Sequence, residues 1–204
     1  MSNCESWKID FERSTLRFRI PHARLGEITG QFDCWGGKVL VDLTSIHRLA
    51  VRIWVELSSI NTGSRRRDRA ILATELFDQQ WEPGLEFDGD RWEIDASDRI
   101  QLVGSVGLRG FRKTVSVTVE TPTLEVDSAG VPRFVCAART SIDRRALGLR
   151  KPHGAAGWLS DLLLGDRIEM LAHLEAMPES ASVVPWVPAA LGGLRRAMTP
   201  QLTP

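Results

Sequence analysis

The chain has 204 residues, a length that suits a single domain with a sizeable core. Its 26 basic and 26 acidic side chains balance, which argues against the strongly basic face that nucleic-acid-binding proteins usually carry. The apolar runs are all shorter than the ~18 residues of a membrane helix, and the first ten residues lack the basic and apolar regions of a signal peptide.

Alternating apolar and polar side chains predict that most of the chain forms short strands. They mark strands at 16–20, 49–57, 100–108, 115–120 and 168–175. This alternation turns one face of each strand inward and the other toward water, and many antiparallel strands of this kind form a sandwich or a barrel. Glycine and aspartate clusters predict turns at Gly36-Gly37, Asp88-Gly89-Asp90 and Asp127-Ser128-Ala129-Gly130.

One segment, 57–78, does not alternate throughout. It begins as the end of an apolar strand and turns at Asn61-Thr62-Gly63, where Asn61, Thr62 or Ser64 can cap a helix. Charged residues then lead into apolar residues at non-alternating positions, which predicts a short helix over 65–77. One short helix within a run of strands suggests a closed sheet with the helix covering one end.

The end of the chain differs in composition. The segment 178–204 holds five of the ten prolines, so we expect a domain over 1–177 and a Pro-rich C-terminal tail over 178–204. The tail is interpreted either as a flexible appendage or as a segment that docks Trp186 and Leu191 on the domain or on a partner. Cys4, Cys34 and Cys136 are odd in number and show no metal-ligand spacing, so we expect a cytoplasmic protein with no metal site and no structural disulfides.

Several motifs resemble those of one family, in the same order along residues 7–176. They are Trp7-Lys8-Ile9-Asp10, Ser14 to Ile20, His22 to Gly37, Ser59-Ile60-Asn61-Thr62-Gly63 with Arg67-Asp68, Leu76-Phe77-Asp78, Pro83 with Phe87, Gly104 to Val117, Ile142-Asp143-Arg144, Gly148-Leu149, and Gly165-Asp166-Arg167-Ile168. This is the YceI-like family of polyisoprenoid-binding proteins. The resemblance implies an all-β fold, an extended, lipocalin-like antiparallel barrel of about eight strands.

The resemblance also implies a function, which is to bind and sequester or carry a long-chain isoprenoid lipid such as a prenyl quinone or polyprenyl phosphate. It implies no catalysis and no cofactor other than a bound isoprenoid lipid or quinone. Transient membrane contact and a homodimer are compatible with it, and nucleic acid is not an expected partner. Ala70 stands where the family often has a histidine, so a ligand contact through that side chain would be missing here.

The candidate ligand-binding residues are apolar side chains on the inward faces of the strands, with two aromatic residues of the 65–81 region that close or gate one end. They are Leu16, Phe18, Ile20, Phe32, Val51, Ile53, Val55, Phe77, Trp81, Phe87, Leu102, Val106, Val117, Val119, Phe134 and Met170. The alternative is that these side chains fill the barrel as an ordinary core, leaving a solid interaction module.

An enzyme that uses the same interior is a further alternative, although the sequence contains no G-x-S-x-G, phosphate-loop or H-E-x-x-H motif. For Arg67 and Asp68 we expect a structural role, such as an ion pair that holds the helix to the barrel wall. The run Arg65-Arg66-Arg67 is interpreted as a solvated charged face or as an attractor for an anionic phosphate or membrane surface.

Overall fold

The computed structural model describes residues 4–22, 26–42, 49–72, 84–108, 110–147 and 165–179. Within them, eleven strands form one antiparallel sheet with a single short α-helix. The elements are β1 (Cys4–Ile9), β2 (Thr15–His22), β3 (Gly26–Phe32), β4 (Trp35–Asp42), β5 (Ala50–Glu56), η2 (Leu57–Ser59), β6 (Ile60–Asn61), α1 (Arg65–Leu72), β7 (Gly84–Ile94), β8 (Ile100–Leu108), β9 (Phe111–Val126), β10 (Pro132–Asp143), η4 (Arg144–Leu147) and β11 (Arg167–Pro178).

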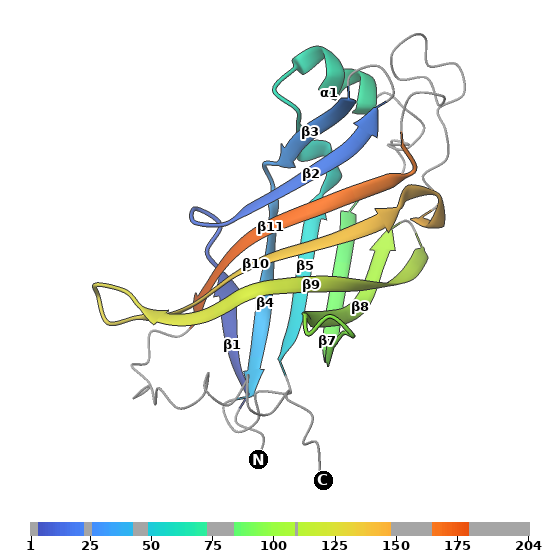
Figure 1. The fold of residues 1–204 in the computed structure, drawn as a ribbon. Coiled ribbons are helices and arrows are strands. Elements are labelled where there is room, and N and C mark those ends of the chain that lie inside the picture. Colours follow the sequence, from blue (N-terminus) through green and yellow to red (C-terminus); the bar gives the residue numbers. More distant parts are fainter. Residues whose placement is uncertain are drawn as a thin grey trace.

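Eight of these strands close into a barrel in the order β1-β4-β5-β7-β8-β9-β10-β11 (Figure 1). The seam lies between the first strand and the last, where Trp7 pairs with Pro178 and Ile9 pairs with Ala176. The first half of β11 instead pairs with β2, which continues into β3 and β6. The predicted all-β, lipocalin-like barrel is therefore confirmed, with three further strands extending one side of it.

Strand alternation correctly predicts which face of the wall turns inward. On β5, Val51 and Val55 are buried, whereas the intervening Arg52 and Trp54 are exposed. Val106 on β8 and Val119 on β9 are buried in the same core. The core is therefore the inner face of the barrel. No helix among the described residues is long and apolar enough to cross a membrane.

Two of the three predicted turns are wrong, because their glycines lie inside strands. Gly36 and Gly37 belong to β4, and Gly89 belongs to β7, where the ladder shifts register between Gly89 and Arg91. A β-carbon on Gly36 would lie 2.8 Å from the Trp54 ring, and one on Gly89 would lie 2.7 Å from the Phe87 ring. These glycines make room for neighbouring side chains and do not reverse the chain.

The third predicted turn, at Asp127, is correct, and the β7–β8 hairpin repeats its geometry. The Asp127 carboxylate accepts hydrogen bonds from the N–H groups of Ala129 and Val131, each at 2.9 Å. In the other hairpin, Asp95 accepts from the N–H groups two and four residues later, at 2.8 and 3.0 Å. In both turns the residue three positions after the aspartate, Gly130 or Asp98, has a positive φ. Each aspartate thus satisfies the backbone of its own turn.

These turns predict a loss of stability in acid. The N–H of Val131, together with the Arg133 guanidinium, lowers the pKa of Asp127, and the N–H of Arg99 does the same for Asp95. A carboxyl whose pKa is depressed on folding stabilises the fold above its unfolded pKa of about 3.9, and that contribution is lost as the pH falls through the folded value. We expect the melting temperature to fall steeply below about pH 4. The measurement is a series of thermal melts between pH 6 and pH 2.

The matched control for the acid melts is Asp127→Asn. The amide oxygen still accepts from the turn but does not titrate, so the acid-dependent fall should be smaller in this variant than in the wild type. Identical pH profiles for the two proteins would show that this turn does not contribute to the acid sensitivity.

Candidate functional site

The inside of the barrel contains an apolar cavity of about 100 Å³. All eight barrel strands contribute to its wall, and β2 adds Leu16. The accessible surface of the cavity is formed entirely by apolar atoms. Ile53, Val117 and Met170 point inward yet remain partly accessible, because they face this cavity and not a filled core. The side chains of the wall therefore leave part of the interior vacant.

The size of the cavity limits what fits without rearrangement. An apolar cavity of about 150 Å³ is known to hold one benzene molecule, and typical ligand pockets measure about 300–1,000 Å³. The vacant space here thus matches a fragment of about one isoprene unit. A longer chain requires the wall side chains to change rotamer or the ends of the barrel to open.

The structure brings eleven of the sixteen predicted ligand-binding residues together around this cavity. They are Leu16, Val51, Ile53, Val55, Phe87, Leu102, Val106, Val117, Val119, Phe134 and Met170. Because they come from β2, β5, β7, β8, β9, β10 and β11, the barrel closure is what assembles them.

Three predicted residues, Phe18, Ile20 and Phe32, lie outside the cavity wall. Phe18 and Phe32 are buried with their ring centroids 5.4 Å apart, and Ile20 packs against the same core. Phe18 lies opposite the cavity residue Met170 where β2 pairs with β11, but its ring packs on Phe32 of β3 and not on the cavity. Phe77 and Trp81 lie outside the described residues, so the prediction that they close one end is not tested.

Twelve further residues line the cavity although they were not predicted to do so. They are Ile9, Val39, Leu85, Trp92, Cys136, Ala138, Arg139, Thr140, Ile142, Ala172, Leu174 and Ala176. Most continue an alternation already visible in the sequence, as Ala172 and Leu174 continue that of Met170. Ala138 and Ala172 pair with each other across β10 and β11, and their small side chains leave space inside the barrel.

The polar groups of the cavity wall have partners of their own. Thr140 donates its hydroxyl to the carbonyl of Ser116 at 2.9 Å, Arg139 forms an ion pair with Glu120 at 3.0 Å, and Trp92 donates its indole N–H to Leu49 at 2.8 Å. Burial raises the pKa of the Cys136 thiol to about 12, which makes a nucleophilic thiolate scarce at neutral pH. The described part of the wall contains no carboxylate and no histidine.

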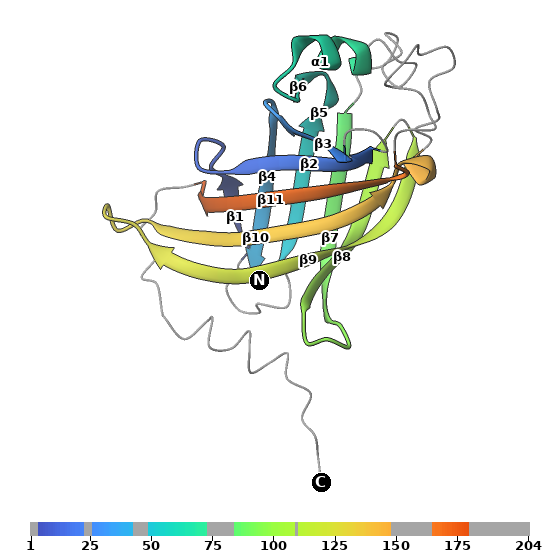
Figure 2. The same ribbon diagram turned by 45° about the horizontal axis from the view of Figure 1, so that its top comes forward.

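The helix α1 stands at one end of the barrel, next to β3 and β6 (Figure 2). Thr62, which follows β6, donates both its N–H and its hydroxyl to Asp68 Oδ1, at 2.9 and 2.7 Å. Arg67 donates to the Thr62 hydroxyl and, at 2.8 Å, to the Thr62 carbonyl. Arg67 and Asp68 thus have the structural role that was predicted, but their described contacts are hydrogen bonds to Thr62 and not an ion pair with the wall.

Comparison with known proteins places these features in a family. The profile described as the YceI-like domain matches residues 7–176. A UPF0312 protein of Staphylococcus aureus (strain N315) is 25% identical over 115 residues, which cover 56% of this chain. The match spans 64% of the length of that relative.

Solved structures share the fold at low sequence identity. BcnA of Burkholderia cenocepacia superposes with a TM-score of 0.66 at 16% identity, covering 82% of this chain and 98% of that one. The YCEI protein of Campylobacter jejuni superposes with a TM-score of 0.62 at 16% identity, and the match covers 78% of this chain and 90% of that one. A polyisoprenoid binding domain from Saccharophagus degradans, implicated in plant cell wall breakdown, superposes with a TM-score of 0.60 at 12% identity. This match covers 85% of the present chain and 99% of that domain.

Proposed function

The chain belongs to the YceI-like family, and on that basis we propose that its barrel binds the hydrocarbon chain of a long isoprenoid lipid and sequesters or carries it. The observation that carries this proposal is the apolar cavity inside the closed sheet, whose wall is drawn from every barrel strand. The fold neighbour from Saccharophagus degradans, whose name describes a polyisoprenoid binding domain, supports the same class of ligand.

Chain length decides whether such a ligand binds. Burying one CH₂ group is worth ~0.8 kcal/mol, so a five-carbon isoprene unit contributes roughly 3–4 kcal/mol. Association itself costs about 4–15 kcal/mol, which one unit does not offset but several units do. The ligand class is therefore a long prenyl chain, and its extra length must enlarge the cavity of about 100 Å³.

The wall has side chains that can make this enlargement. Met170 is unbranched and adapts its shape more readily than β-branched residues do. It lies on the inner face of β11 together with Ala172, whose small side chain already leaves space. We propose that the prenyl chain runs along this face, and that its head group is that of a quinone or a phosphate.

Native mass spectrometry of gently purified protein tests the proposal. The protein is expressed in a lipid-replete host, and we expect a second species heavier than the bare chain by the mass of one isoprenoid. That added mass also distinguishes a prenyl quinone from a polyprenyl phosphate. A spectrum that contains only the bare protein would count against the function.

A cavity-filling variant serves as the matched control. In Ala172→Phe an aromatic ring occupies the space beside Ala138 without adding charge, so bound lipid should be lost while the barrel stays folded. If a folded Ala172→Phe variant kept its lipid, the ligand would have to lie elsewhere on the protein.

A further inference from the structure

The helix α1 carries different side chains on its two faces. Arg65, Arg66 and Arg69 are exposed and, at spacings of three and four residues, share one side of the helix. The other side carries Arg67 and Asp68, which are only partly exposed and bind Thr62. The outer face of α1 is therefore purely basic.

The single acidic residue of α1 does not neutralise this face. Asp68 Oδ1 already accepts two hydrogen bonds from Thr62, which hold the carboxylate on the inner side of the helix. No carboxylate of the described residues lies within 4.0 Å of Arg65, Arg66 or Arg69. The three positive charges are thus open to an external partner.

Several exposed arginines of the barrel strands and of the β7–β8 turn are arranged differently. Arg52 pairs with Asp88 at 2.6 Å, Arg91 pairs with Glu93 at 2.9 Å, and Arg99 pairs with Asp95 at 2.8 Å. Arg167 of β11 is also exposed and has no carboxylate within 4.0 Å among the described residues, but it is a single such residue on its strand, whereas α1 gathers three on one face.

We propose that the outer face of α1, formed by Arg65, Arg66 and Arg69, docks the protein on an anionic lipid membrane. Basic side chains near such a surface each add about a fivefold preference for binding it, and the effect weakens as salt screens the charges. The chain as a whole has no net charge, so a membrane would attract this end of the molecule and not the whole surface.

The position of α1 gives the contact a purpose. The cavity wall extends toward this end of the barrel as far as Val55, Leu85, Ile142 and Met170, which lie near the ends of their strands. Docking through α1 would place the same end of the barrel against the bilayer that supplies isoprenoid chains. The purpose rests on the proposed function, whereas the docking rests only on the charges of α1.

Vesicle sedimentation tests the docking. The full chain is mixed with vesicles of pure phosphatidylcholine or of phosphatidylcholine with 30% phosphatidylglycerol, at low and at physiological salt. We expect binding to the anionic vesicles only, weakening with salt. The variant Arg65→Gln/Arg66→Gln/Arg69→Gln should bind them on the order of 100-fold more weakly, since three arginines are lost.

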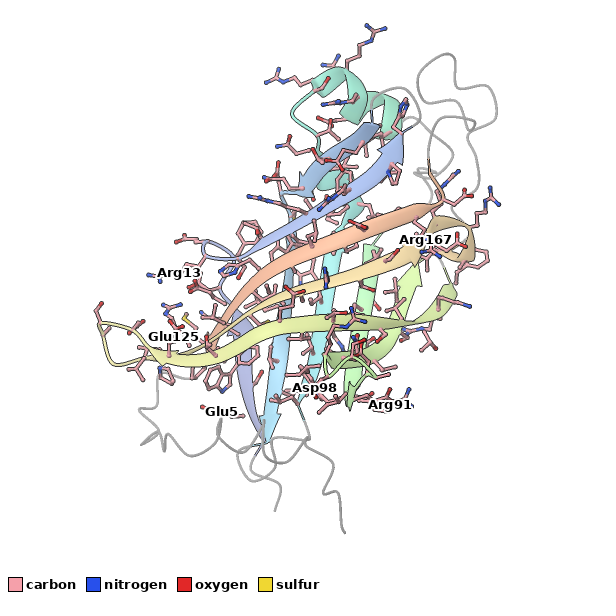
Figure 3. The ribbon with its side chains drawn as sticks, viewed as in Figure 1. Glu5, Arg13, Arg91, Asp98, Glu125 and Arg167 are labelled. Atoms are coloured by element: carbon pink, nitrogen blue, oxygen red, sulfur yellow. The ribbon has the colours of Figure 1, made fainter. Side chains whose placement is uncertain are left out.

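The matched control removes the same charge from the opposite end of the molecule. In Arg52→Gln/Arg91→Gln/Arg99→Gln, three paired arginines of the wall are neutralised; Figure 3 shows Arg91 and Asp98 far from α1. This variant should keep wild-type vesicle binding, and circular dichroism reports whether both variants are folded. Equal binding by the α1 variant and the wild type, or wild-type binding to pure phosphatidylcholine, would overturn the docking surface.

A second readout separates this inference from the proposed function. The α1 variant should still show its bound isoprenoid by native mass spectrometry, because none of the three arginines lines the cavity. Lost vesicle binding with retained lipid supports the docking surface. A wild-type protein that carries lipid but does not bind anionic vesicles would contradict the docking surface. The proposed lipid-binding function would still be supported.

Discussion

Replacing Val117 with aspartate is expected to empty the barrel of lipid. Val117 lies on the inner face of β9, opposite Leu102, and lines the cavity. The one cation of the described wall, Arg139, is already paired with Glu120, so a carboxylate at position 117 would be left without a partner, and an unpaired buried charge is very unfavourable. We expect no isoprenoid by native mass spectrometry and a loss of about 3 kcal/mol in the free energy of unfolding.

The neighbouring residue gives a control at the same place in the chain. Ser116 points to the outside of the barrel and is exposed, so Ser116→Asp adds the same charge without entering the cavity. This variant should keep its lipid, and it gives up only what the hydrogen bond from Ser116 to Gln101 contributes to stability, about 1 kcal/mol. Val117→Thr, which changes little but polarity, is the fallback if Val117→Asp does not fold. A folded Val117→Asp protein that still carries lipid would refute the assignment of this face to the ligand.

Adding one methyl group at Gly104 is expected to destabilise the barrel strongly. Gly104 pairs with Gly89 between β8 and β7, and its missing side chain points at the backbone of β7. A β-carbon there would fall on the carbonyl oxygen of Asp88 and 2.6 Å from the α-carbon of Gly89. Backbone atoms within a ladder cannot move aside as a flexible side chain does. We expect Gly104→Ala to cost about 3 kcal/mol, the upper part of the range for overpacked cores.

Gly107 in the same strand provides the comparison. A β-carbon at Gly107 would find its nearest neighbour, the Arg112 side chain, at an ordinary 3.7 Å. Gly107→Ala should therefore be neutral or stabilising by about 0.5 kcal/mol, because it lowers the entropy of the unfolded chain. Urea unfolding of the two variants measures the difference. Equal stabilities would show that β7 and β8 separate readily and that the close approach at Gly104 is not a constraint.

Strand alternation predicts well which side chains turn inward, because it depends only on the geometry of a strand. Val51, Ile53 and Val55 were assigned to the inner face from that pattern alone, and the cavity has all three in its wall. Alternation does not say how far along the barrel a residue lies. Phe18 and Phe32 are buried as expected, yet their rings pack on each other and are not part of the cavity wall.

Small residues were the weak point of the sequence-based interpretation. Gly36 and Gly89 suggested turns, since glycine is common in turns, but here they accommodate the rings of Trp54 and Phe87. Ala138 and Ala172 were not proposed as cavity residues, because an alanine looks unremarkable until its partner across the strands is known. The shape of the interior depends on such pairings, which one sequence does not reveal.

The seam between β1 and β11 joins the two extremes of the domain, and this sets the order in which the protein can be made. As the ribosome delivers the chain, the sheet can grow through β10, but it cannot become a cylinder until Pro178 emerges to meet Trp7. Until then the apolar side chains of the inner face remain exposed to solvent on an open sheet. Contacts between segments so far apart in the chain make folding slow. The exposed inner face is therefore open to aggregation with other chains until the last strand has paired.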